Sequence, residues 1–106
     1  MLRKLLGKVE AGRFGRALAG LQAGWQWEVR HRVFVARGVE LRGKVKYSSK
    51  VYSVSISPKG ASCSCDDFIN RGVLCMHIAF VAMAELSHEA AERSAHRQVQ
   101  EVRAGQ

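Results

Sequence analysis

The chain has 106 residues, of which 47% are hydrophobic and 25% charged, with a single proline. This length suits one small domain, and the composition excludes a disordered polar chain and a low-complexity array. The apolar runs are too short to cross a membrane and the basic N-terminus lacks the pattern of a signal peptide, so we expect a cytoplasmic protein with no membrane partner. The absence of threonine and the single asparagine favour a prokaryotic or phage source.

Positive charge is concentrated in the first half of the chain. There are 17 Lys and Arg residues against 9 Asp and Glu residues, which gives a formal net charge of +8. Residues 1–62 alone carry a net charge of +10, whereas residues 63–106 carry −2. Such a basic half favours a polyanionic partner, either nucleic acid or an acidic protein.

The first segment, residues 1–24, has the pattern of an amphipathic helix, because its apolar residues recur at steps of three and four. Gly12 and Gly15 weaken this pattern, which predicts two short helices or one bent helix that ends near Gly24. The basic side chains are expected to face solvent, and they are Arg3, Lys4, Lys8, Arg13 and Arg16. Their face is either a simple solvated surface or a surface that lies on nucleic acid or a membrane.

After Gly24 the apolar period changes to two, which indicates strands. In the first strand one face is expected to carry Trp25, Trp27, Val29, His31, Val33 and Val35, and the other Gln26, Glu28, Arg30, Arg32 and Phe34. A second strand after Gly38 has one apolar and one basic face, with Gly43 as a bulge or bend. A third strand stops at Ser57-Pro58-Lys59-Gly60, which predicts a turn and a hairpin partner over residues 61–65.

A small antiparallel sheet built from these strands would gather basic side chains on the face away from the core. We expect this face to bind the phosphates of nucleic acid through Arg30, Arg32, Arg42, Lys44 and Lys46. The alternative is that these side chains only keep an exposed sheet face soluble. Trp25 and Trp27 share the parity of the valines, so we expect them to pack in the core rather than to stack on bases.

Three cysteines and a histidine lie within fifteen residues, as Cys63-Ser64-Cys65 and Cys75-Met76-His77. Cys63 and Cys65 would direct both sulfur atoms to one side of a strand. Cys75 is expected just before a buried helix over about residues 74–86, with His77 in its first turn. Three thiolates and one imidazole complete a tetrahedral Zn²⁺ site with no position for a reactive water, which predicts one structural zinc ion. Metal-free cysteines, a Cys/His catalytic pair and an iron–sulfur cluster fit this spacing less well.

Two runs extend the pattern beyond these ligands. Cys65-Asp66-Asp67-Phe68 and Cys75-Met76-His77-Ile78 are similar to the Cys-x-Asp-Phe and Cys-Lys-His-Ile runs of SWIM-type zinc fingers, and residues 52–83 as a whole resemble that family. The resemblance implies that Cys63, Cys65, Cys75 and His77 bind zinc and that Phe68 is a packing residue. Leu74 and Met76 replace a proline and a lysine found in many members, which argues against DNA contact through the zinc knuckle itself. Asp66 and Asp67 are expected to support the loop rather than to form a catalytic pair.

These observations predict an α+β fold in three segments. Residues 1–24 form the N-terminal helical part, residues 25–86 the small sheet with a ββα SWIM-type finger that ends in a buried helix, and residues 87–106 a solvated C-terminal helix or tail. The core motif of the finger is residues 52–83.

SWIM fingers occur in transposases, chromatin-remodelling ATPases, ubiquitin ligases and recombination accessory proteins, where they are credited with binding DNA or other proteins. The family resemblance therefore implies a binding module rather than an enzyme. The sequence therefore predicts a zinc-stabilised nucleic-acid-binding module, with DNA favoured over RNA, that is an accessory in DNA transactions. The alternative is an adaptor that binds a recombination, transposition or transcription protein. A metal-dependent hydrolase would need an open coordination position.

Overall fold

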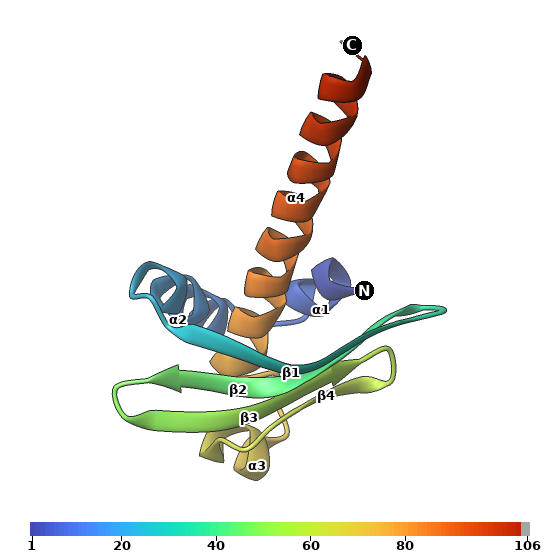
Figure 1. The fold of residues 1–106 in the computed structure, drawn as a ribbon. Helices are drawn as coiled ribbons and strands as arrows, with labels where there is room; N and C mark the ends of the chain where they lie inside the picture. Colours follow the sequence, from blue (N-terminus) through green and yellow to red (C-terminus); the bar gives the residue numbers. More distant parts are fainter. Residues whose placement is uncertain (105–106) are drawn as a thin grey trace.

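Four strands form one antiparallel sheet in the order β1-β2-β3-β4 (Figure 1). The structure is a computed structural model that describes the backbone of residues 1–104 and the side chains of residues 1–95. The strands are β1 (Gln26–Val35), β2 (Gly38–Tyr47), β3 (Lys50–Ser57) and β4 (Gly60–Cys63). Ser48 and Ser49 have φ values of 47° and 64°, as the central residues of a tight hairpin turn require. The predicted turn at Pro58-Lys59 is confirmed.

The four helices of the described chain are α1 (Leu2–Gly7), α2 (Ala11–Gln22), α3 (Asp66–Arg71) and α4 (Met76–Ala104), and with the sheet they confirm the predicted α+β fold. The N-terminal segment is thus two helices. The break lies before Glu10, whose side chain caps α2 by accepting a hydrogen bond from the backbone N–H of Gly12. Gly12 and Gly15 therefore lie inside a helix.

The last helix, α4, joins two segments that the sequence predicts separately. The buried helix was expected to end near Leu86 and to be followed by a solvated helix or tail, but α4 continues without a break to Ala104, and its second half extends away from the sheet (Figure 1). Of the predicted C-terminal segment, residues 105 and 106 lie outside the described residues. No described helix combines the length and the apolar character needed to span a bilayer.

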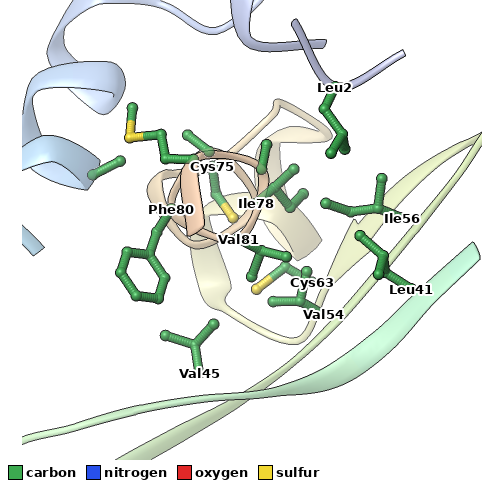
Figure 2. Packing of buried hydrophobic residues seen from close by; sticks show 14 of the residues in the cluster. Leu2, Leu41, Val45, Val54, Ile56, Cys63, Cys75, Ile78, Phe80 and Val81 are labelled. Carbon is green, nitrogen blue, oxygen red and sulfur yellow. The ribbon is translucent and has the colours of Figure 1, made fainter. Parts of the chain in front are cut away.

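The hydrophobic core lies between one face of the sheet and the first half of α4 (Figure 2). The sheet contributes Leu41, Val45, Val54 and Ile56, and α4 contributes Ile78, Phe80 and Val81. Leu2 of α1 and Ala17 of α2 are buried in the same cluster. We call this side of the sheet the covered face and the opposite side the open face.

A β-bulge in β1 decides which side chains reach each face. The pairing of β1 with β2 shifts between Val29 and His31, so that Arg30 is an extra residue in the ladder. Before the bulge, Trp27 and Val29 share the covered face with their partners on β2. After it the alternation is reversed, because Arg32 is paired with the buried Leu41.

The faces expected for the second half of β1 are therefore wrong. His31, Val33 and Val35 lie on the open face, and Arg32 and Phe34 on the covered one. Gly43 is paired with Val29 beside this bulge. A Cβ atom at Gly43 would collide with the carbonyl oxygen of Glu28 and with the ring of Trp27, so the bulge requires glycine there.

Candidate metal centre

The four predicted zinc ligands come from three parts of the fold. Cys63 ends β4, Cys65 and Cys75 immediately precede α3 and α4, and His77 is the second residue of α4. All four are buried, and their ligand atoms lie within 4.8 Å of one another. This cluster confirms the ligand set that the sequence predicts.

The distances in this cluster fit a tetrahedral zinc ion. His77 Nδ1 lies 3.7 Å from Cys63 Sγ and 3.9 Å from Cys75 Sγ. Zinc bonds of about 2.0–2.3 Å at tetrahedral angles would separate the ligand atoms by about 3.5–3.8 Å. Three thiolates and one imidazole are also the soft donors that Zn²⁺ prefers in structural sites. The residues therefore fit one zinc ion, which would crosslink β4 to the starts of α3 and α4.

The segment between the second and third ligands folds into a helix that was not predicted from the sequence. Cys65 Sγ accepts a hydrogen bond of 3.4 Å from the backbone N–H of Phe68 and caps α3. Gly72 ends α3 with a left-handed φ of 63°. Two aspartates in the first turn and a glycine after the last turn were the available signals of such a helix. Phe68 packs against the core, as predicted.

The three thiols influence one another's ionisation. A hydrogen bond with Cys63 lowers the pKa of Cys75 to about 4, although burial opposes this shift. The same interaction, together with burial, raises the pKa of Cys63, and burial raises the pKa of Cys65. Negative charge therefore forms most readily on Cys75, and a bound divalent cation is needed to stabilise three thiolates together.

Tyr47, at the end of β2, fixes the orientation of the His77 ring. Its hydroxyl oxygen lies 2.7 Å from His77 Nε2, on the side of the ring opposite Nδ1. Because Nδ1 faces the sulfur atoms, Nε2 carries the proton and donates it to Tyr47 Oη. Burial raises the pKa of Tyr47 to about 12, so the phenol stays neutral. No sequence signal links Tyr47 to His77, thirty positions away.

Aromatic rings support both partners of this hydrogen bond. The ring of Tyr52 stacks on His77 with a centroid distance of 4.1 Å, and Trp25 stacks on Tyr47 at 4.0 Å. Trp25 also meets the ring of Phe80 edge-on. Trp25 and Trp27 both pack against the core, as predicted.

We expect the Tyr47→Phe variant to bind zinc about tenfold more weakly, because it keeps the ring but removes the acceptor that orients His77. Titration of the protein against a chromophoric zinc chelator measures this change. Tyr52→Phe is the matched control, since Tyr52 contacts His77 through its ring. Equal zinc affinity in the wild type and Tyr47→Phe would contradict this role for the hydroxyl.

A bidentate ion pair joins α2 to α3, the helix between the second and third zinc ligands. Arg13 of α2 donates from Nε and Nη2 to the two carboxylate oxygens of Asp67, at 2.7 and 2.9 Å. The expectation that Arg13 faces solvent is wrong, since its side chain is only 12% exposed. This hydrogen bonding lowers the pKa of Asp67. Its contribution to stability is therefore present at neutral pH and is lost as the pH falls through the lowered pKa.

The fold and the centre together define a structural zinc-binding module, in which three cysteines and one histidine hold the end of a hairpin against a helix. Residues 52–85, about a third of the chain, match the family model of the SWIM zinc finger, and this matched stretch holds the three cysteines and the histidine of the cluster. Neither the curated proteins nor the solved structures provide a match to the chain.

The structure separates the five predicted nucleic-acid contacts. Arg42, Lys44 and Lys46 alternate along the open face of β2, and Arg30 is the bulged residue of β1, paired with Glu28 at 3.0 Å. Arg32 does not share this face. Its guanidinium donates to both carboxylate oxygens of Glu85 on α4, at 2.8 and 2.6 Å, because the bulge turns it to the covered face. Arg32 is therefore removed from the candidate interface.

Proposed function

We propose that this protein is a small nucleic-acid-binding module, with DNA favoured over RNA, whose open sheet face contacts the phosphate backbone. The observation that supports this proposal is the row of Arg42, Lys44 and Lys46 on a sheet face that none of the described helices covers. Alternate residues of a strand are about 6.8 Å apart, so the row presents regularly spaced cations. Among the described side chains, no carboxylate lies within ion-pair distance of Arg42 or Lys44, whereas Arg30 and Lys46 both pair with Glu28.

The placement of the aromatic rings favours backbone contact over base stacking. Proteins that bind single strands on a sheet use exposed aromatic side chains as stacking platforms. Here Trp25, Trp27, Tyr47 and Tyr52 all pack against the core from the covered side. The open face offers cations and hydroxyls instead, which are groups that contact phosphates without reading sequence. We therefore propose a duplex ligand and little sequence preference.

Fluorescence anisotropy across a salt series tests this function with duplex and single-stranded DNA and RNA. We expect the logarithm of the binding constant to fall linearly with the logarithm of salt concentration. The Arg42→Gln/Lys44→Gln variant should bind more weakly and lower this slope by about two, one for each lost phosphate contact. Arg3→Gln/Lys4→Gln on α1 is the control with the same change in charge. Equal losses in both variants, or no binding by the wild type at low salt, would contradict the proposal.

An adaptor that binds a recombination, transposition or transcription protein is the second candidate. Phe34 is 71% exposed and borders a groove of α1, β2 and α4 that is lined by apolar side chains and by the charged Arg3, Glu89 and Arg93. Such a patch is typical of protein-binding surfaces. The adaptor is favoured if the protein fails to bind nucleic acid and if Phe34→Ser abolishes capture of a protein partner that the wild type retains.

The proposal does not include catalysis. Four protein ligands complete a tetrahedral zinc site and leave no position for an activated water. The module would instead be an accessory in DNA transactions. Its thiolate centre suits a reducing compartment, and a cytoplasmic location is part of the proposal.

A further inference from the structure

The chain from β4 to the start of α3 carries the first two zinc ligands and two serines. Ser62 is paired with Ser55 of β3, on the face opposite Cys63. Ser64 continues this pattern, because its backbone N–H donates to the carbonyl oxygen of Ser53 at 3.0 Å. Its hydroxyl accepts a hydrogen bond of 2.9 Å from the N–H of Ser53. Ser62 and Ser64 thus alternate along the chain with the zinc ligands Cys63 and Cys65.

These serines complete two rows that cross the sheet from β2 to β4. Strand pairing places Arg42 beside Ser55 and Lys44 beside Ser53. We name the two rows the serine rungs, and they consist of Arg42-Ser55-Ser62 and Lys44-Ser53-Ser64. Neighbouring strands are about 4.8 Å apart, and alternate residues of one strand are about 6.8 Å apart. Each rung therefore offers one cation and two hydroxyls within the reach of a single phosphate group.

The charge distribution on β3 and β4 also favours these rungs, although Glu28 of β1 is paired in the ladder with Lys44. β3 and β4 contain no acidic residue. The acidic residues of the sheet, Glu28 and Glu40, belong to β1 and β2, and Glu28 pairs with Arg30 and Lys46. Lys44 Nζ donates a hydrogen bond of 2.6 Å to Ser53 Oγ, so the cation and one hydroxyl of this rung are in direct contact.

We propose that the serine rungs are the phosphate-binding site of the open face, and this inference rests on the proposed nucleic-acid function. In each rung the cation pairs with one phosphodiester and the serine hydroxyls donate hydrogen bonds to its oxygens. The two rungs then hold neighbouring phosphates of one strand. Zinc supports this site without contacting the nucleic acid. It binds Cys63 and Cys65 and thereby fixes the positions of the neighbouring Ser62 and Ser64.

The test separates hydroxyl donors from charge. In the Ser55→Ala/Ser62→Ala variant we expect the affinity for duplex DNA to fall about tenfold, because two hydrogen bonds are lost. The slope with salt should not change, because no charge is removed. Arg42→Gln, in the same rung, should lower the slope by about one. Ser87→Ala on α4 is the control, because Ser87 is an exposed serine that is not part of the open face.

Two further measurements exclude a folding defect as the cause. Zinc content and melting temperature should match the wild type in every variant. Ser55→Thr/Ser62→Thr keeps both hydroxyls on strand-compatible side chains and should bind like the wild type. Affinity within twofold of the wild type in the alanine variant, with binding weakened in Arg42→Gln, would overturn the serine rungs and leave the proposed function standing. Failure of the wild type to bind any nucleic acid would overturn the proposed function itself.

Discussion

We expect chelation of zinc to unfold the β3–β4 hairpin together with α3 and the first turns of α4. Three of the buried side chains in the core are the zinc-binding cysteines, and His77 is buried beside them. Binding of structural zinc contributes about 10–16 kcal/mol in small zinc-finger peptides. The whole free energy of unfolding of a small domain is about 5–15 kcal/mol. Loss of the ion therefore removes an amount comparable to the total stability.

A pair of histidines on α4 provides the matched variants for this prediction. His77→Ala should bind less than one zinc ion per chain and lose most of the cooperative thermal transition seen by circular dichroism. His88→Ala should behave like the wild type, because His88 is exposed and its Nε2 lies 3.1 Å from Glu92 of the same helix, away from the zinc ligands. A full equivalent of zinc and an unchanged melting temperature in His77→Ala would contradict the assigned ligand set.

The metal centre could be predicted from the sequence because its geometry is local. Two residues of a strand that are two positions apart face the same side, and a ligand in the first turn of a helix needs only that helix. Cys63 ends β4 with Cys65 two positions on, and His77 lies in the first turn of α4 with Cys75 directly before that helix. The turn at Pro58-Lys59 was predictable for the same reason, because proline and glycine determine which φ values their own backbone can adopt.

The features that escaped prediction depend on contacts between distant residues. The bulge at Arg30 exists only because Gly43, on the facing strand, lets β1 approach closely. The contact between Tyr47 and His77 and that between Arg13 and Asp67 each join parts of the chain that no periodicity relates. The length of α4 is a different case, since its second half has few apolar residues and the pattern predicted only a solvated helix or tail.

The bulge also leads to the second large effect, the destabilisation expected for Arg32→Ala. Glu85 is 4% exposed, and its carboxylate is bound by the Arg32 guanidinium through two hydrogen bonds. Removal of Arg32 leaves a buried carboxylate without a partner, which costs about 2–3 kcal/mol of unfolding free energy when the partner is partly exposed. A loss of this size lowers the melting temperature of a domain of this length by about 10 °C.

Arg30, two positions away on the same strand, is the control that makes this prediction specific. Its ion pair with Glu28 is exposed, so Arg30→Ala should leave the melting temperature nearly unchanged. Nucleic-acid binding should show the opposite order, with weaker binding in Arg30→Ala and unchanged binding in Arg32→Ala below its melting temperature.

The Arg32→Leu/Glu85→Leu variant removes both charges and should recover most of the lost stability, because an apolar pair can replace a buried ion pair. Equal stability of Arg30→Ala and Arg32→Ala would show that β1 has no bulge, since a regular strand would place both arginines on the open face.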